Sequence, residues 1–376
     1  MLLRLKSLII LMLIVSLMPA GSIGQSATPG KYKVIGYVGG FRGLVAAEQI
    51  DVQKLTHIMY AFVNVKDSLA VLTNLATDST NFRKLNLLKL KNPDLKIIIS
   101  IGGWAWSENF SDAVLTETSR QAFARSAVEI VRQYNLDGVD IDWEYPGMPG
   151  EEGNVYRPED KQNFTLMFKS CREELDKLAA ETGKKYELAT AVGGSQSFID
   201  HTEMGVLEKY LDFINIMTYD YGGKNGTVGH HTNLYAYGDF EDVSSADRSV
   251  RNFIAAGVPP HKIGLGAAFY GKGWQAESAV NNGLGQKRVK TVQGGGYTKL
   301  KDTVINQNGN VRYFDKKAKA PYLFNAATHT LISYDDEKSI KAKCKYVKKH
   351  KLAGIFFWEY FNDPKGYLLG QIDKSL

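Results

Sequence analysis

Cysteine is nearly absent from this chain of 376 residues, which contains Cys171 and Cys344 and no others. Two cysteines cannot build the disulfide framework on which small secreted domains depend, so we expect two free thiols. Cysteine and histidine also nowhere recur with the spacing of a zinc site, and we interpret the adjacent His230 and His231 as a turn or substrate loop. The sequence therefore predicts no metal site and no cofactor.

Dense basic blocks interleaved with aromatic residues are absent, although the formal net charge is +6. This absence argues against a role in nucleic-acid binding.

Long apolar runs are absent except at residues 8–17, which follow Arg4 and Lys6 and end before Pro19. That run is too short to span a bilayer. We expect residues 1–27 to be a signal peptide and the mature chain to be secreted or periplasmic without a membrane span. The alternative is an uncleaved N-terminal anchor.

Short β-rich runs alternate with helix-like segments along the chain. Such alternation predicts parallel βαβ units. The eight runs are 33–37, 57–63, 96–101, 138–142, 187–192, 213–217, 263–267 and 354–358. Helical patterns cover 119–133, 158–180, 244–256 and 338–350. Eight units over this length fit an α/β fold of the (β/α)8 TIM-barrel type. An open doubly wound sheet is the alternative, but no Gly-x-Gly-x-x-Gly follows the first run.

The spacing breaks once, because the chain between Ala267 and Gly354 is too long for one crossover. The segment at about 273–333 contains glycines at 294–296 and several aromatic residues. We expect it to be a small α+β insertion after strand seven of a catalytic barrel that occupies residues 31–376.

Three acidic residues, Asp140, Asp142 and Glu144, are spaced by two. In a strand they share one face, and neighbouring acids stand roughly 6–7 Å apart. The alternate positions are Val139, Ile141 and Trp143. Carboxyl groups that point into a barrel repel one another, which raises the pKa of at least one and keeps a proton available. Glu144 is nearest the C-terminal rim, where barrel enzymes place their chemistry, so we assign it as the general acid.

Two other interpretations of these acids are weaker. An exposed edge strand would not carry strongly apolar residues at every alternate position. A calcium loop of the EF-hand type requires glycine after its third acidic position, and an aromatic residue stands there instead.

The motif Asp137-x-x-Asp140-x-Asp142-x-Glu144 resembles the signature of glycoside hydrolase family 18, the chitinases. Three further segments resemble that family in the right order: 100–104 (Ser-Ile-Gly-Gly-Trp), 217–221 (Met-Thr-Tyr-Asp-Tyr) and 358–360 (Trp-Glu-Tyr). The resemblance covers the chain from Tyr32 onward. The insertion resembles the α+β insertion of the deep-cleft chitinases.

The resemblance implies a substrate-assisted retaining mechanism, which the family uses instead of two catalytic carboxylates. Glu144 would protonate the glycosidic oxygen, and the N-acetyl oxygen of the substrate would attack the anomeric carbon. Asp142 would hold the acetamido N–H, with Asp140 beneath it. Tyr219 would hold the acetamido oxygen, and Asp220 would contact the distorted sugar. The residues alone leave open whether Asp142 is instead a covalent nucleophile.

Aromatic residues at strand ends suggest a sugar-binding cleft. Trp104, Trp106, Trp274 and Trp358 follow or end predicted strands and should lie near the C-terminal rim, whereas Trp143 should be packing. The resemblance implies that Trp358 is the floor under the cleaved sugar. The further cleft residues that we expect are Tyr37, Phe62, Trp104, Trp106, Met217, Tyr221 and Tyr270. The residues expected to be structural are Asp137, Ser100, Gly102 and Gly103.

Two departures from the family pattern affect the outer subsites. The chain lacks the aromatic-rich stretch after strand one, where Phe41 stands, and it has Ala268 and Lys272 in place of proline and arginine. We expect a monomer that binds chitin or N-acetylglucosamine oligomers. The alternatives are a hydrolase of peptidoglycan or N-glycan cores, and a chitin-binding lectin that has lost catalysis.

Overall fold

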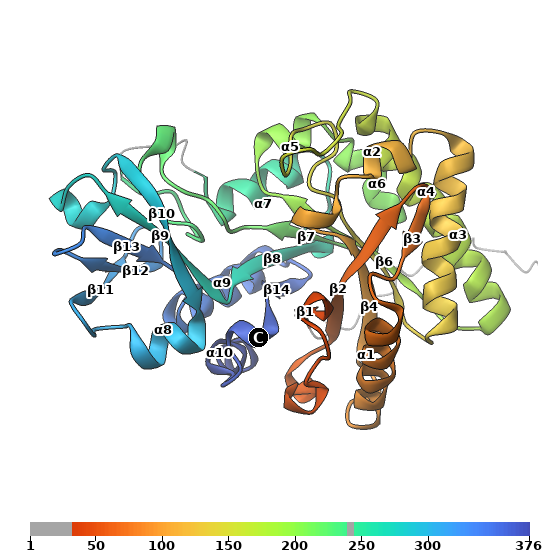
Figure 1. Ribbon diagram of the computed structural model, residues 1–376, viewed down its shortest axis with the longest axis horizontal. Helices are drawn as coiled ribbons and strands as arrows, with labels where there is room; N and C mark the ends of the chain where they lie inside the picture. Colours follow the sequence, from red (N-terminus) through yellow and green to blue (C-terminus); the bar gives the residue numbers. More distant parts are fainter. Residues whose placement is uncertain (1–31, 239–243) are drawn as a thin grey trace, which may run out of the picture. The chain divides into compact units, whose positions relative to one another are not determined.

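The computed structural model describes residues 32–238 and 244–376. Within these ranges eight parallel strands close into a barrel, in the order β1, β14, β8, β7, β6, β5, β4, β2, and β2 pairs back onto β1 (Figure 1). The strands are β1 (Lys33–Gly39), β2 (His57–Lys66), β4 (Lys96–Gly102), β5 (Gly138–Asp142), β6 (Glu187–Gly193), β7 (Phe213–Met217), β8 (Ile263–Ala268) and β14 (Gly354–Trp358). The expected (β/α)8 barrel is confirmed. The expected signal peptide, residues 1–27, lies outside the described residues.

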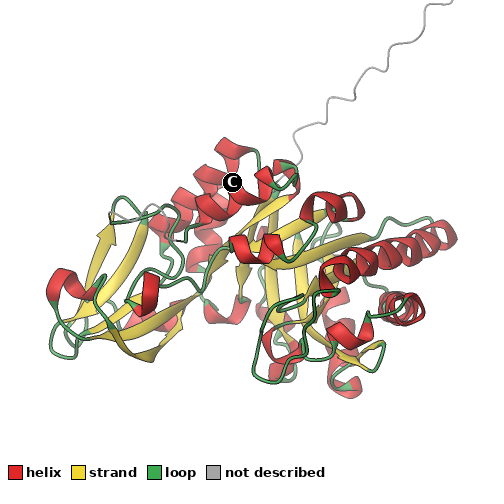
Figure 2. Ribbon diagram, turned by 90° about the horizontal axis from the view of Figure 1, so that it is seen from above, coloured by secondary structure: helices red, strands yellow, loops and turns green. Residues whose placement is uncertain are grey.

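Helices surround the barrel strands (Figure 2). They are α1 (Leu75–Leu87), α2 (Phe110–Ala113), α3 (Glu117–Gln133), α4 (Asp160–Thr182), α5 (Gln196–Asp200), α6 (Met204–Leu207), α7 (Ala246–Ala255), α9 (Glu337–His350) and α10 (Tyr367–Ser375). Local sequence fixes several boundaries. Thr116 begins α3 with a capping box, and Asp336 begins α9 in the same way. Gly183 ends α4 with φ of +69°, a conformation that glycine adopts without strain.

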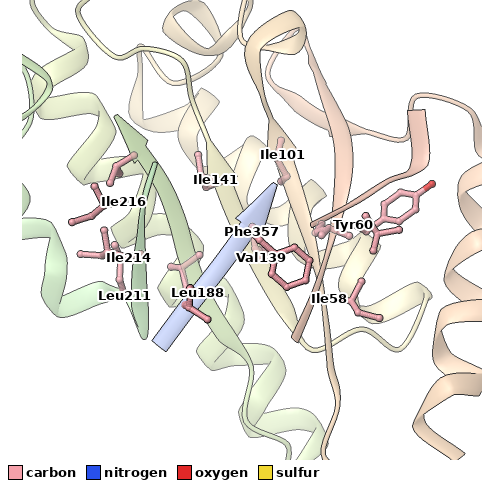
Figure 3. Packing of buried hydrophobic residues seen from close by; sticks show 14 of the residues in the cluster. Ile58, Tyr60, Ile101, Val139, Ile141, Leu188, Leu211, Ile214, Ile216 and Phe357 are labelled. Carbon is pink, nitrogen blue, oxygen red and sulfur yellow. The ribbon is translucent and has the colours of Figure 1, made fainter. Parts of the chain in front are cut away.

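The hydrophobic core has two layers, because successive side chains of each strand point to opposite faces. The outer layer lies between the strands and the helices, and Figure 3 shows part of it, with Val139 and Ile141 of β5 among neighbours from β4, β6 and β7. The inner layer fills the barrel and includes Ile35, Met59 and Phe356. This alternation sends the even-numbered residues of β5 into the barrel. In the described part of the chain, no helix is long and apolar enough to cross a membrane.

A second sheet follows β8 directly. Its antiparallel strands run in the order β10, β9, β13, β12, β11 and lie at the left of Figure 1. Its elements are β9 (Tyr270–Ala276), β10 (Arg288–Gly296), α8 (Tyr297–Thr303), β11 (Asn310–Asp315), β12 (Ala320–Asn325) and β13 (Thr330–Ser333). A short strand, β3 (Leu69–Val71), pairs antiparallel with β2.

Trp274 does not lie at the barrel rim as expected. It belongs to β9, is 1% exposed, and packs in the hydrophobic core of the second sheet with Tyr322 and Phe324. The sequence interpretation failed here because β9 continues almost directly from β8 and carries the chain away from the barrel.

Both cysteines are free and buried. Cys171 lies in α4 and Cys344 in α9, each facing the outer layer of the core. Burial raises the pKa of both thiols to about 12.

A charged cluster lies at the N-terminal end of the barrel. Glu187, at the start of β6, accepts from Lys33 Nζ at 3.0 Å, and its other oxygen lies 2.7 Å from His57 Nε2. Burial raises the pKa of Glu187, but the contacts with His57 and Lys33 together outweigh it and lower the pKa to about 2. The cluster therefore favours the charged carboxylate.

We expect Glu187→Gln to lower the free energy of unfolding at neutral pH by about 2–3 kcal/mol. Because the pKa of Glu187 is lowered in the fold, its contribution is complete above the unfolded-state pKa of about 4.3 and is lost as the pH falls towards 2. Urea unfolding of both proteins at several pH values measures the difference. Glu173→Gln, on the exposed face of α4, is the control. If the difference in free energy of unfolding between wild type and Glu187→Gln stays the same as the pH falls, a lowered pKa of Glu187 is not its cause.

Candidate active site

The three acidic residues of the β5 motif point towards the inside of the barrel at its C-terminal end. Asp140 is fully buried and Asp142 is 5% exposed, whereas Glu144, just beyond the strand, is half-buried and lines a cleft. Trp143, between them, faces the outer layer, where its ring stacks on Phe110 at 5.2 Å. The carboxyl groups therefore form a series that rises from the barrel interior to the cleft.

Asp140 lies deepest and is held by two hydroxyl groups. Tyr37 and Ser100 both donate to its Oδ2, at 2.9 Å and 2.7 Å. Its Oδ1 has no hydrogen-bond partner within the described residues. Burial raises the pKa of Asp140 to about 6, although the two hydrogen bonds act in the opposite direction. This carboxyl group is therefore poised between its charged and neutral forms.

The structure does not place Tyr37 in the cleft, contrary to expectation. Tyr37 is 2% exposed, its hydroxyl donates to Asp140, and it accepts from Asn215 Nδ2 at 3.4 Å. Its ring lies beneath Trp358, with the ring centroids 6.0 Å apart. Tyr37 thus supports the acidic series from below, because its hydroxyl reaches across the barrel to the deepest of the three acids.

Asp142 stands between the other two carboxyl groups. Its Oδ1 also lacks a hydrogen-bond partner among the described residues. Burial raises its pKa well above the ordinary value, and the charges of Glu144 and Asp140 raise it further. A buried polar atom without a partner is costly unless a ligand or water completes it. Asp142 is therefore ready to accept a hydrogen bond from a bound molecule.

The two glycines at the end of β4 allow the chain to pass close to Asp142. Gly102 and Gly103 have φ of +107° and +85°, which side chains rarely adopt. A Cβ at Gly102 would lie 2.3 Å from the Asp142 carbonyl oxygen, and a Cβ at Gly103 would lie 2.6 Å from the Phe62 ring. The Gly103 N–H donates to that same carbonyl at 2.6 Å. The loop can therefore anchor the end of β5.

Glu144 has a carboxyl group whose pKa lies near neutral pH. Burial raises its pKa to about 7, a hydrogen bond with Tyr145 acts against this, and the charge of Asp220 adds to it. The backbone of Glu144 is fixed from both sides, since Ser107 Oγ accepts its N–H at 2.9 Å and Asn154 Nδ2 donates to its carbonyl at 3.2 Å. A carboxylic acid of this kind is half-protonated near neutral pH.

The opposite wall of the cleft comes from the end of β7 and the start of β9. Tyr219 lies between the rings of Tyr270 and Phe356, with centroid distances of 6.3 Å and 5.9 Å. Burial raises the pKa of Tyr219, as do the charges of Asp142 and Asp220. Its hydroxyl therefore stays protonated and can donate a hydrogen bond.

Asp220 has φ of +58° and is exposed to the cleft. Lys272, which replaces the arginine of the family pattern, contacts Asp220 Oδ1 at 3.1 Å. The departure at position 272 thus keeps a cation beside Asp220. Tyr221 turns away from this pair, and its hydroxyl lies 2.8 Å from Ser249 Oγ.

Aromatic rings from four neighbouring strand ends form the other side of the cleft. Phe62 and Trp358 stack with an interplanar angle of 18° and a centroid distance of 5.5 Å. Phe41 is nearly parallel to both, and Trp106 lies 5.6 Å from Phe62. Trp104 stands apart from this group, 48% exposed, with its ring 6.3 Å from Tyr145. These are flat surfaces of the kind on which sugar rings stack.

The cleft has a volume of about 730 Å³. It brings together most of the residues predicted for it: Asp142, Glu144, Tyr219, Asp220, Tyr221, Met217, Tyr270, Trp358, Phe62, Trp104 and Trp106. It also contains residues that the sequence did not suggest as cleft residues: Phe41, Tyr145, Met148, Phe198, Ser195 and Lys272. The position of Tyr145 directly after Glu144 was a signal for one of these. Met148 and Phe198 come from loops whose path the strand pattern does not define.

Asp137 lies away from the cleft, at the N-terminal end of β5. Its Oδ2 accepts from the Ile97 N–H at 2.7 Å and contacts Lys89 Nζ at 2.6 Å. This position ties β5 to β4 and to the short 3-10 helix Leu88–Leu90, which precedes β4.

His230 and His231, interpreted as a turn or substrate loop, lie in the loop after β7 and do not line the cleft themselves, although His231 Nδ1 lies 3.8 Å from Oδ1 of the cleft residue Asp220. Both side chains are fully buried where the loop after β7 meets the second sheet. His230 contacts Asp315 at 3.3 Å, and the His231 N–H donates to Ser333 Oγ. Among the described residues, no group of three or more His, Cys, Asp or Glu side chains could hold a metal ion.

A closed β/α barrel in which a series of three carboxyl groups ends in an aromatic-lined cleft fits the architecture of a glycoside hydrolase. The model of the glycosyl hydrolases family 18 matches residues 33–363, so the chain belongs to that family. The resemblance seen in the sequence motifs is thereby confirmed.

Relatives of known name agree with this membership. Chitinase A1 of Niallia circulans is 42% identical over 311 residues, which cover 79% of this chain but 44% of that protein. A family 18 N-acetylglucosaminidase from Paenibacillus barengoltzii matches with a TM-score of 0.85 and 45% identity, covering 92% of this chain and all of that one. A chitinase-like agglutinin from Robinia pseudoacacia shares the fold, with a TM-score of 0.77, 28% identity and coverage of 91% of this chain and 98% of that one.

Proposed function

We propose that this protein is a secreted chitinase that hydrolyses β-1,4 bonds between N-acetylglucosamine units with retention of configuration. The observation that carries the proposal is the series Asp140, Asp142 and Glu144, which ends in an aromatic cleft with Tyr219 on the facing wall. Export rests on the basic and apolar pattern of residues 1–27.

In the first step, the protonated carboxyl group of Glu144 donates its proton to the glycosidic oxygen, and the bond between that oxygen and the anomeric carbon breaks. The carbonyl oxygen of the substrate's own N-acetyl group attacks the anomeric carbon and forms a cyclic oxazolinium ion. Positioned proton transfer of this kind is worth about 10²–10⁴ in rate.

Two side chains hold the acetamido group during this step. Asp142, whose Oδ1 lacks a partner in the described structure, accepts a hydrogen bond from the acetamido N–H and stabilises the positive charge. Tyr219, whose raised pKa keeps its hydroxyl protonated, donates to the acetamido oxygen and holds it for attack. Asp140 shares the buried negative charge beneath them.

In the second step, the ionised Glu144 removes a proton from a water molecule, which attacks the anomeric carbon from the side that the leaving group has left. The oxazolinium ring opens, the acetamido group is restored, and Glu144 regains its proton. Two displacements at one carbon give net retention.

The cleft also supports the choice of substrate. Stacked rings of Trp358, Phe62 and Phe41 offer apolar surfaces to a linear sugar chain. Chitinase A1 and other named chitinases are relatives. Because a similar chain, which is matched over its whole length, is an N-acetylglucosaminidase, release of single sugars from a chain end is the second candidate activity.

The test is hydrolysis of chitotetraose, with the products followed in time. Release of smaller N-acetylglucosamine oligomers whose fresh reducing ends are β-anomers supports the proposal, and release of monomer alone selects the second candidate. A tetramer deacetylated at the sugar to be cleaved should resist hydrolysis, because it lacks the internal nucleophile. Binding without cleavage identifies a lectin, and neither binding nor cleavage points to peptidoglycan or N-glycan cores.

We expect kcat/KM for chitotetraose to fall as the pH rises through about 7, because the general acid must carry its proton and the pKa of Glu144 in the free protein is raised to about 7. A pH profile of kcat/KM in buffers of constant ionic strength measures this basic limb. Asp220→Asn removes a charge that raises the pKa of Glu144, so the limb of that variant should move to lower pH. A wild-type kcat/KM that stays constant well above neutral pH contradicts the role of Glu144.

A further inference from the structure

A fully buried ion pair joins the second sheet to the barrel below the cleft. Lys343 of α9 contacts Asp335 Oδ2 at 2.6 Å, and the two side chains are 1% and 0% exposed. Lys343 Nζ also donates to Thr232 Oγ1 at 2.6 Å and to the Gly266 carbonyl at 3.3 Å. The Asp335 carboxylate further accepts from Thr232 at 2.9 Å and from the Ala268 N–H at 3.1 Å. We call these residues the Lys343 cluster.

The cluster contacts the backbone on which Tyr219 rests. The Gly266 carbonyl accepts from Lys343 and also from Thr218 Oγ1, at 2.8 Å, and Thr218 directly precedes Tyr219. Gly266 itself lies against the Tyr219 ring, since a Cβ added there would be 3.0 Å from its Cε1. One buried ammonium group thus fixes the strand end that supports the ring and the residue that leads into it.

The same cluster also reaches the partner ring of Tyr219. Ala268, whose N–H donates to Asp335, stands two residues before Tyr270. The rings of Tyr219 and Tyr270 pack edge to face. The ends of β7 and β8 are therefore held in one register by charges that do not reach the cleft.

Burying two charges is expensive, and breaking such a pair leaves one charge without compensation. A pair that served only to attach the second sheet could lie anywhere along that contact. Apart from a hydrogen bond from Ser339 of α9 to Asp335, the hydrogen bonds of this pair instead lead to Thr232 and to the backbone of Gly266 and Ala268 behind Tyr219. A displacement of about 1 Å in a positioning group can cost about 10²-fold in rate.

We propose that Lys343 is a positioning residue for catalysis, which acts through Gly266 and Thr218 to hold Tyr219 against the acetamido group of the substrate. This inference rests on the proposed function, in which Tyr219 holds the acetamido oxygen. The residue itself touches no substrate.

The test compares two lysine-to-methionine variants at opposite ends of the barrel. Lys343→Met should lower kcat on chitotetraose by about tenfold or more, because Tyr219 no longer holds the acetamido oxygen in the position for attack. KM should change little, because the rings on which the sugars stack stay in place. Lys33→Met breaks the contact with Glu187 at the N-terminal end and should keep kcat within about twofold, even where it lowers Tm as much. Equal kcat losses in both variants overturn the proposal.

Thr232→Val is the second variant, because it keeps both charges but removes the hydroxyl that accepts from Lys343 and lies 3.5 Å from the Thr218 carbonyl oxygen. We expect it to fold even if Lys343→Met does not, and to lower kcat in the same direction. In a Tyr219→Phe background, Thr232→Val should lower kcat very little further, because the Tyr219 hydroxyl that the cluster positions is already absent. If Thr232→Val lowers kcat by the same factor in that background as in wild type, the proposal is contradicted.

A readout that does not need turnover separates this proposal from the proposed function. In protein labelled with fluorotyrosine, the ¹⁹F resonance missing from Tyr219→Phe identifies Tyr219 among the 20 tyrosines. That resonance should shift in Thr232→Val and remain in place in Lys33→Met. If it stays in place in Thr232→Val, the positioning role is wrong. If it shifts while wild-type protein never cleaves chitotetraose, the proposed function fails and the positioning of Tyr219 stands.

Discussion

Replacing Glu144 with glutamine should lower kcat on chitotetraose by about 10²–10⁴-fold while the variant still binds the oligomer. Glutamine has nearly the shape of glutamic acid but no proton to give to the leaving oxygen. The hydrogen bonds from the backbone N–H of residue 144 to Ser107 and from Asn154 to its backbone carbonyl do not involve the side chain and remain possible. Steady-state kinetics and calorimetric titration of the variant measure the two quantities.

The matched control is Glu152→Gln, the same change at an exposed position in the loop after β5. It should keep wild-type kcat, so that a loss seen with Glu144→Gln cannot come from the change of charge on this loop. If Glu144→Gln retains activity within tenfold of wild type, another group supplies the proton and the assignment is wrong.

Replacing Asp142 with asparagine should lower kcat by about 10²–10³-fold, because the positive charge of the oxazolinium ion loses its buried counter-charge. The acetamido N–H can still find an oxygen acceptor on asparagine, so the KM for chitotetraose should change much less than kcat. The burial of Asp142 strengthens the effect, since no solvent screens a charge there. Kinetics with chitotetraose and a fixed enzyme concentration give both values.

Asp176→Asn serves as the control for this change, because Asp176 is an exposed acid on α4 that pairs with Arg172. It should leave kcat unchanged. A result in which Asp142→Asn loses binding and catalysis equally would mean that Asp142 contributes uniform binding and no charge stabilisation in the transition state.

The barrel and the acidic series were predictable because each follows from a local period. Val139, Ile141 and Trp143 alternate with three acids, and an alternation of two places the acids on one face whatever their neighbours are. The β-rich runs were recognisable for the same reason, and every predicted run corresponds to a barrel strand. A local pattern does not show how close a side chain lies to the side chains of other strands.

Tyr37 illustrates that limit. It stands on a strand that leads to the cleft, as Phe62 does, but the pleat directs its hydroxyl to Asp140 across the barrel, a separation of 103 residues along the chain. Phe41 illustrates the opposite error, since a sequence without an aromatic-rich stretch still places one ring parallel to Trp358. Lys343 and Asp335 belong to no motif that was recognised in the sequence. Their meeting depends on how α9 packs against the end of β8.

The two buried cysteines give this protein a practical property. Thiol-reactive dyes attack the thiolate, and thiols whose pKa is raised to about 12 expose almost none of it at neutral pH. A cysteine introduced at an exposed position beside the cleft, such as Ala105, would therefore take up a fluorophore against a nearly silent background. A reporter placed there, between the indoles of Trp104 and Trp106, would let single turnovers be followed as changes in fluorescence quenching when an oligomer enters and leaves.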